Sequence, residues 1–263
     1  MESGNHSNHA PGPIDARGAL LGDFEVVGTM PPNEVAEAIE RDRVIFVARP
    51  GFYRKLIPLR IENDGRLFSG GRYLFRTFEQ VADFYRWFRD EFRLDGKLFV
   101  ERSWVKDFSR LTFHVIGAHD FKDVRRSQFA VRAERWVVSG ERGAALESAW
   151  PAVRDRAEHE GLASVWLLYS EQRREAALVT VADRTGKADA TPDVATLDAL
   201  ARLTSPATEF AANEWARKTF DRTGWVFTVW FDPGHNPLSL WPNSPPLPGL
   251  PSTAESATQR RAP

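Results

Sequence analysis

The sequence predicts an α+β protein in which two similar units follow one another along the chain. Helical and strand patterns alternate through the body, their local order returns after 65 residues, and both ends have compositions typical of unfolded segments. The chain has 263 residues, 42% of them hydrophobic, which is enough for one large core or two smaller ones. We expect a disordered tail at 1–22, units at 23–127 and 128–232, and a disordered, proline-rich tail at 233–263.

The first unit is centred on an amphipathic helix over residues 77–92. Its apolar residues recur at steps of three and four, and Thr77 with Gln80 has the spacing of a capping box. Elsewhere in this unit we expect a helix at 31–43 and strands at 24–28, 44–50, 56–61, 70–75, 97–105 and 110–121, with a polar turn at 106–109. This order would make the first unit a permuted or a degraded copy of the second.

The second unit aligns with the first without a gap at an offset of 65 residues. The offset places Val81 on Leu146 and Phe88 on Val153 within the helices, and Val100 on Val165 within the strands that follow. Two helices at 193–203 and 207–220 and a strand at 225–231 then complete the order β-α-β-β-α-β, which is the ferredoxin-like order.

Composition and motifs exclude several classes of function. The net charge is −1 and acidic residues interrupt the basic ones, so we expect no nucleic-acid partner. No apolar run reaches the ~18–20 residues of a membrane span and no secretion signal is found, so we expect no membrane partner and a cytoplasmic location. The absence of cysteine removes disulfides, thiolate nucleophiles and cysteine-type zinc sites.

Two segments of the chain resemble the dimeric α/β-barrel superfamily, which includes antibiotic-biosynthesis monooxygenase-like proteins. They are SGGRYLFRTFEQVADFYRWF and the segment from Glu147 to Arg184. The resemblance covers roughly residues 67–232. It implies two four-stranded sheets packed into a barrel, here within one chain, with a small hydrophobic ligand between each sheet and its helices. A homodimer is compatible with this fold.

The same resemblance implies a small enzyme acting on a hydrophobic aromatic or polyketide-like substrate, most concretely a cofactor-independent monooxygenase. A cyclase, an isomerase and a non-catalytic protein that binds a hydrophobic ligand remain alternatives on this fold. Haem ligation by a histidine is a further alternative, although the monooxygenase interpretation requires no cofactor and no metal.

Polar residues within the predicted strands are the candidates for chemistry. His114 is the candidate base, and Arg72 or Arg102 would stabilise the substrate anion. His114 and His119 face opposite sides of a regular strand, but a bulge at Gly117 would bring them onto one face. Hydrogen bonding within the strand and surface ion pairs are the alternative roles for these groups. The candidates for substrate contact are Tyr73, Trp104, Trp166 and His119.

Overall fold

The computed structural model describes residues 11–28, 30–124, 129–139, 143–183 and 216–231. Its strands are β1 (Gly12–Pro13), β2 (Gly18–Val26), β3 (Phe52–Ile61), β4 (Leu67–Phe75), β5 (Arg93–Leu94), β6 (Lys97–Leu98), β7 (Val105–Asp120), β8 (Phe129–Val138), β9 (Ser164–Ser170), β10 (Glu175–Asp183) and β11 (Ala216–Phe231). Its helices are α1 (Pro32–Arg41), α2 (Arg43–Val47), α3 (Phe78–Asp90), the short 3-10 helix η1 (Phe99–Glu101) and α4 (Gly143–His159).

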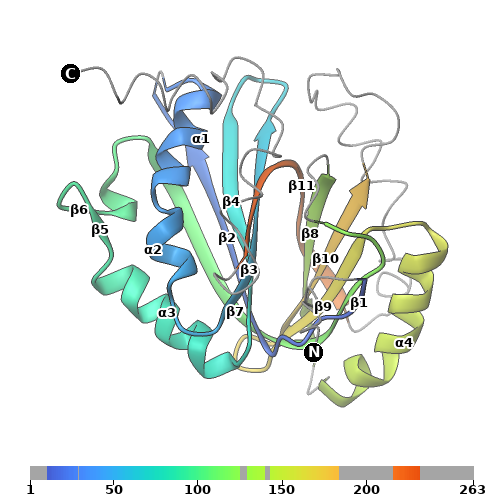
Figure 1. Cartoon of the computed structure of the whole chain (residues 1–263). Helices are drawn as coiled ribbons and strands as arrows, with labels where there is room; N and C mark the ends of the chain where they lie inside the picture. The colour runs from blue at the N-terminus through green and yellow to red at the C-terminus, as the bar shows by residue number, and fades with distance from the viewer. Residues whose placement is uncertain (1–10, 29, 125–128, 140–142, 184–215, 232–263) are drawn as a thin grey trace, which may run out of the picture.

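The long strands form a closed antiparallel barrel. The order around it is β7-β2-β4-β3-β11-β8-β10-β9, and the last strand pairs back onto β7. The two-residue strand β1 pairs with the end of β7 outside this ring. Helices α1, α2 and α3 lie on one side of the barrel and α4 on the opposite side (Figure 1). The α+β class is therefore confirmed.

Two kinds of apolar layer result from the alternation of side chains along the strands. One cluster takes residues from all eight barrel strands and fills the barrel interior, with Trp166, Phe113 and Leu74 among its fully buried members. Two further clusters lie between the outside of the barrel and the helices: one under α1, α2 and α3, the other under α4. The layers outside the barrel, beneath the helices, are where the resemblance places a ligand.

Each half of the barrel contains four strands. In chain order, the first half runs β2, β3, β4, β7 and has the spatial order β7-β2-β4-β3. The second half runs β8, β9, β10, β11 and has the spatial order β11-β8-β10-β9. In both halves the fourth strand lies beside the first, and the third separates the first from the second.

The predicted central helix is confirmed with its cap. Thr77 Oγ1 accepts a hydrogen bond from the Gln80 backbone N–H at 3.3 Å, and Gln80 Oε1 accepts one from the Thr77 backbone N–H at 3.1 Å. Val81, Phe84 and Phe88 then face the sheet and are buried. The helix begins and ends within the predicted range of 77–92.

The strand predicted at 44–50 is wrong, because residues 43–47 form α2. A short apolar run fits a buried helix as well as a strand, and here a single turn of helix lets Phe46 pack edge-on against Phe88 and Trp230.

The helix predicted at 207–220 is wrong over residues 216–220, which begin β11. The rest of that segment, the helix at 193–203 and the tail from residue 233 lie outside the described residues.

The strand predicted at 97–105 is wrong over residues 99–104, and the turn predicted at 106–109 is also wrong. Residues 97–98 form the short strand β6 and 99–101 form η1, whereas β7 runs from Val105 without a turn. Pairing along β2 overrides the turn-forming residues, and a register shift between Asp23 and Glu25 accommodates them.

The offset of 65 residues therefore equates unlike elements. Val100 lies in η1 and is 53% exposed, whereas its supposed counterpart Val165 is buried in β9. The N-terminal boundary also shifts, since β2 begins at Gly18, within the segment expected to be a tail. No helix among the described residues is long and apolar enough to cross a membrane.

Candidate functional site

A chamber lies between the outer face of the first four strands and helices α1, α2 and α3. Its cavity volume is about 20 Å³, and it adjoins an outer pocket of about 140 Å³ that opens beside α3 and η1. Phe88, Phe99, Phe108 and Arg110 line both spaces, so they form the wall between them.

Lys55 is the unusual residue of this chamber. It projects from β3, is 4% exposed, and its Nζ lies 3.9 Å from the ring centroid of Trp230 and 4.8 Å from those of Phe46 and Tyr73. Within the part of the chain that the structure describes, this amine makes no hydrogen bond and no ion pair. Burial lowers the pKa of Lys55 to about 7, so a large fraction of the amine is neutral near neutral pH.

Glycine at position 71 provides the room for this side chain. A Cβ there would lie 2.3 Å from a ring carbon of Tyr73 and 3.0 Å from Lys55 Cε. Because residue 71 has no side chain, the Tyr73 ring and the Lys55 stem can lie directly over β4. Burial raises the pKa of Tyr73, so its hydroxyl stays protonated and can donate a hydrogen bond to a ligand.

Two carboxylates at the junction of α1 and α2 are close enough to affect Lys55: Asp42 lines the chamber, and Glu40 lies beside it. Asp42 accepts two hydrogen bonds from Arg102, at 3.0 and 3.2 Å. Glu40 accepts one from Arg43 at 3.0 Å and one from Trp230 Nε1 at 2.9 Å. Burial raises the pKa of both carboxyls despite these partners. Each acid therefore has its own donor, and neither forms an ion pair with Lys55.

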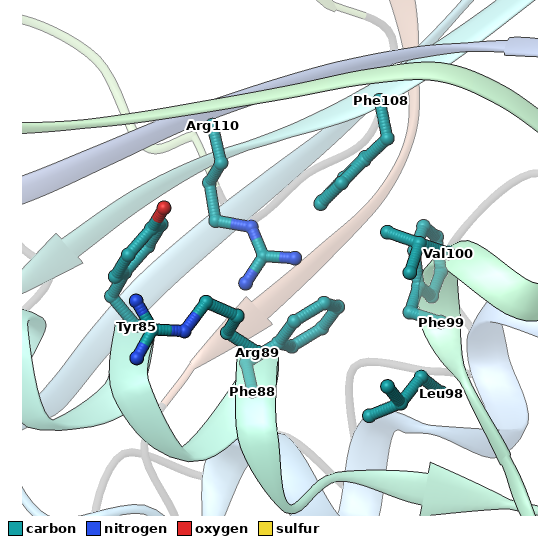
Figure 2. Close-up of a pocket in the computed structure, with 8 residues that line it drawn as sticks. All are labelled: Tyr85, Phe88, Arg89, Leu98, Phe99, Val100, Phe108 and Arg110. Atoms are coloured by element: carbon teal, nitrogen blue, oxygen red, sulfur yellow. The ribbon is translucent and has the colours of Figure 1, made fainter.

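Arg110 projects from β7 toward α3 and forms part of the wall of the outer pocket (Figure 2). Its guanidinium carbon lies 3.5 Å from the ring centroid of Phe88 and 4.3 Å from that of Phe108. Its Nη1 is buried without a hydrogen-bond partner in the described structure. Burial lowers the pKa of Arg110 to about 10, which leaves it a cation at neutral pH.

These groups suit an anionic, flat, aromatic ligand. The chamber offers aromatic faces for stacking, an amine that can accept a proton, and a guanidinium with unused donors that can stabilise a negative charge. Among the described residues, no three His, Asp or Glu side chains are placed to hold a metal ion.

Three of the residues predicted from sequence lie in or beside the chamber. Tyr73 lines it, and Arg102 orients Asp42. Trp104 is not in a strand as expected; it packs edge-on against Phe24 and Phe99 behind the chamber wall.

Arg72 and Trp166 point into the barrel interior instead. Arg72 is the neighbour of Tyr73 on β4, so the alternation of the strand turns it to the other face, where it donates to Asp23 at 2.8 Å. Trp166 lies in the interior cluster, and its Nε1 donates to Ser164 Oγ at 3.0 Å.

The bulge considered at Gly117 is present, because the pairing of β7 with β9 shifts register between Val115 and Gly117. His114 and His119 therefore both face outward from the barrel. His114 is exposed and stacks on Phe78 with ring centroids 3.7 Å apart, whereas His119 packs against Phe121. Neither histidine lines the chamber.

Sequence reasoning missed Lys55 because the strand was expected to begin at Leu56, which left Lys55 in a connection. The same signal that selected Arg72, a charged residue within a strand, would have found Lys55 if the strand had been started at Phe52. Arg110 was missed because its segment begins beside the wrongly predicted turn.

Comparison with known proteins shows the fold. No protein-family model matches the chain, and no curated protein matches it. A solved structure described as a "Putative monooxygenase" from Fusobacterium nucleatum subsp. nucleatum is similar with a TM-score of 0.53 and 13% identity, over 82% of this chain and 95% of that one. An anthrone oxidase-like protein is similar with a TM-score of 0.51 and 14% identity, over 85% and 97% of the two chains. The chain thus shares the fold of these two structures, and its closed eight-stranded barrel is consistent with the dimeric α/β-barrel fold expected from the resemblance.

Proposed function

We propose that this protein is a monooxygenase that oxidises a flat, hydroxylated aromatic compound at Lys55 without a cofactor. The ring system would lie in the outer pocket, and the wall formed by Phe88, Phe99 and Phe108 would move aside to bring it to the amine. The observation that carries the proposal is the partnerless Lys55 amine, buried among aromatic rings next to an unpaired guanidinium. The name of the anthrone oxidase-like neighbour suggests an anthrone as the first substrate to test.

The reaction requires a base and a stabilised anion. A CH₂ carbon of the substrate loses a proton to Lys55 Nζ, and the carbanion that forms is delocalised onto the carbonyl oxygen on the far side of the ring, where Arg110 stabilises it. The carbanion then gives its electrons to O₂, forming a C–O bond and, after protonation, a hydroperoxide. Loss of water leaves a ketone, so that CH₂ and O₂ become C=O and H₂O.

We also propose that the two halves are tandem ferredoxin-like repeats. The support is their shared strand order, in which the fourth strand lies beside the first in each half. On this interpretation β4 corresponds to β10, and α4 corresponds to α1 and α2.

The direct test is oxygen consumption with anthrone in the presence of a metal chelator. We expect saturable consumption with one O₂ used for each anthraquinone formed, faster than the spontaneous reaction. Binding without consumption would support a non-catalytic ligand-binding protein. Exchange of the CH₂ hydrogens with deuterium, without oxygen uptake, would support an isomerase or cyclase.

The role of Arg110 can be measured separately from turnover. We expect Arg110→Gln to weaken binding of 2-naphthoate, an unreactive aromatic anion, by about tenfold, since a charge-assisted hydrogen bond contributes about 1.5–3 kcal/mol. Titration of tryptophan fluorescence measures the affinity, and Arg86→Gln on the exposed face of α3 is the matched control. An equal loss with the uncharged 2-naphthalenemethanol would mean that Arg110 acts through packing rather than charge.

A further inference from the structure

A second polar cluster occupies one mouth of the barrel, on the opposite face of the sheet from the chamber. The interior side chains of β2, β4, β8, β10 and β11 change here from apolar to charged. We call this the mouth cluster; it consists of Asp23, Arg72, Arg135, Arg173, Glu175 and Arg222.

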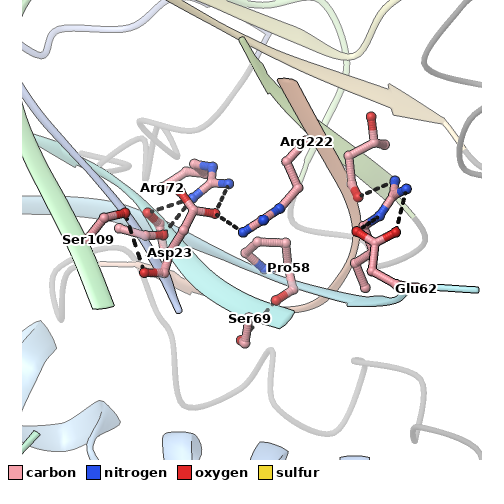
Figure 3. A network of polar contacts seen from close by, with 11 residues as sticks. Asp23, Pro58, Glu62, Ser69, Arg72, Ser109 and Arg222 are labelled. Carbon is pink, nitrogen blue, oxygen red and sulfur yellow. Dashed lines mark hydrogen bonds and ion pairs between the residues drawn. The ribbon is translucent and has the colours of Figure 1, made fainter. Parts of the chain in front are cut away.

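The deepest pair of the mouth cluster is bonded within the protein, except for Arg72 Nε, which is buried without a partner among the described residues. Arg72 is 1% exposed, and it donates to Asp23 Oδ1 at 2.8 Å and to the Gly22 carbonyl at 2.7 Å. Arg222 approaches the same carboxylate from β11, but its Nη1 stays 3.8 Å from Asp23 Oδ1 (Figure 3). This separation exceeds hydrogen-bond length, and within the described ranges no other acceptor bonds to the Arg222 side chain.

Arg135, on the neighbouring strand β8, likewise approaches a carboxylate without a short hydrogen bond to it. Its Nη1 is 3.5 Å from Glu175, a carboxylate that Arg173 also approaches at 3.3 Å. The Arg135 Nε is buried without a partner among the residues described. The cluster therefore has four guanidinium groups and two carboxylates, an excess of two positive charges.

Aromatic rings hold the two underused guanidinium groups near each other. Phe220 lies directly opposite Arg135 in the pairing of β11 with β8, with Arg222 two residues further on the same face. The Phe220 ring centroid is 4.2 Å from the guanidinium carbon of Arg135 and 5.3 Å from that of Arg222, which also lies 4.2 Å from Phe68. The rings cover the faces of the cations, so the N–H groups at their edges remain available to a ligand.

The neighbouring charges do not cancel this excess. Arg60 bonds to both carboxylate oxygens of Glu62. Lys106 lies 3.4 Å from Glu25 and 3.6 Å from Asp107, so the exposed Asp107 is the one extra charge among these groups. Burial lowers the pKa of both Arg135 and Arg222, and the positive charge of Arg72 lowers them further. An anion bound between Arg135 and Arg222 would offset the repulsion among these positive charges.

We propose that the mouth cluster is a binding site for a small oxyanion, a carboxylate or a phosphate, held between Arg135 and Arg222. The side chains of these arginines are 17% and 26% exposed, so the site is largely desolvated but open to solvent. Two guanidinium forks provide the geometry in which Arg binds such groups through paired hydrogen bonds. This site is independent of the function proposed for the chamber.

Calorimetric titration of the full chain with inorganic phosphate and with succinate, at constant ionic strength set with chloride, tests the proposal. We expect saturable binding of at least one of them, weakened at least tenfold in Arg135→Gln and in Arg222→Gln. Arg217→Gln, an exposed arginine of the same strand, should bind like the wild type. Phosphate alone would identify a phosphate ester as the ligand class, and succinate alone a carboxylate.

A second measurement avoids the risk that a variant does not fold. Phenylglyoxal modifies accessible arginines, and the bound anion should slow modification of Arg135 and Arg222 in the wild-type protein but leave that of Arg217 unchanged. The proposal is overturned when neither anion binds saturably to the wild type. It is also overturned when folded Arg135→Gln and Arg222→Gln bind as tightly as the wild type.

Discussion

Lys55→Met is expected to lower the rate of anthrone oxidation by about 10²–10⁴, the usual contribution of a positioned general base. Methionine keeps the length and the apolar stem of the side chain among Phe46, Tyr73 and Trp230 but cannot accept a proton. The loss should therefore appear in kcat, with little change in the affinity for 2-naphthoate measured at pH 9, where the wild-type amine is also uncharged. The loss in kcat is measured as the rate of oxygen consumption at saturating substrate.

Two variants serve as controls for this result. Lys97→Met removes an exposed lysine and should leave the rate unchanged. His114→Ala tests the base chosen from sequence, which faces solvent beside Phe78 rather than the chamber. A large loss in His114→Ala with none in Lys55→Met would reverse the assignment of the base.

Because the pKa of Lys55 is about 7, the rate of anthrone oxidation should depend on pH near neutrality. The wild-type rate should rise with pH through about 7, as the amine loses its proton and becomes a base. The residual activity of Lys55→Met should lack this rise. The negative charges of Glu40 and Asp42 raise the pKa of this amine. The positive charges of Arg102 and Arg110 lower it.

Stability should depend on pH in the corresponding direction. The folded state releases the Lys55 proton near pH 7, whereas the unfolded chain keeps it to about pH 10.4. Between these values the unfolded state binds more protons, so raising the pH stabilises the fold by up to about 1.4 kcal/mol per pH unit. Urea denaturation from pH 7 to 9 should show this slope for the wild type and not for Lys55→Met.

Local patterns predicted those parts of the fold that local forces determine. The helix from Phe78 was predictable because its cap and its apolar stripe lie within a few residues of one another. β7 was not, because its passage through Lys106 and Asp107 depends on pairing with β2, some 80 residues earlier in the chain. The repeat offset failed for the same reason, since apolar spacing alone does not reveal which strands are neighbours.

The sequence predicted where the ligand site lies, between the sheet and the helices, but not which charged residues form it. The resemblance implied a ligand between sheet and helices, and the chamber lies there. Which charged strand residue enters it depends on where each strand begins, because a shift of one residue exchanges the two faces. Arg72 and Tyr73 illustrate this: they are adjacent in the chain, yet one lies in the barrel interior and the other in the chamber.

Asp120→Asn is expected to lower the free energy of unfolding by about 3–5 kcal/mol. Arg54 is fully buried in the barrel interior and donates to both oxygens of Asp120, at 2.9 and 3.1 Å. The substitution leaves the guanidinium buried without a countercharge, 5.4 Å from the ring centroid of Trp166. Urea denaturation followed by circular dichroism and tryptophan fluorescence measures the change.

The size of this effect follows from burial rather than from the number of hydrogen bonds. Asp90→Asn provides the matched control, because Asp90 accepts two equally short hydrogen bonds from Arg89 but both side chains are more than half exposed. We expect little or no loss of stability there, because water screens this exposed pair. The pair Arg54→Met with Asp120→Leu removes both charges and should recover most of the stability lost in Asp120→Asn. Arg54 on β3 and Asp120 on β7 join the two edge strands of the first half across the barrel interior. Equal losses in Asp120→Asn and Asp90→Asn would therefore mean that this pair does not help to close the barrel.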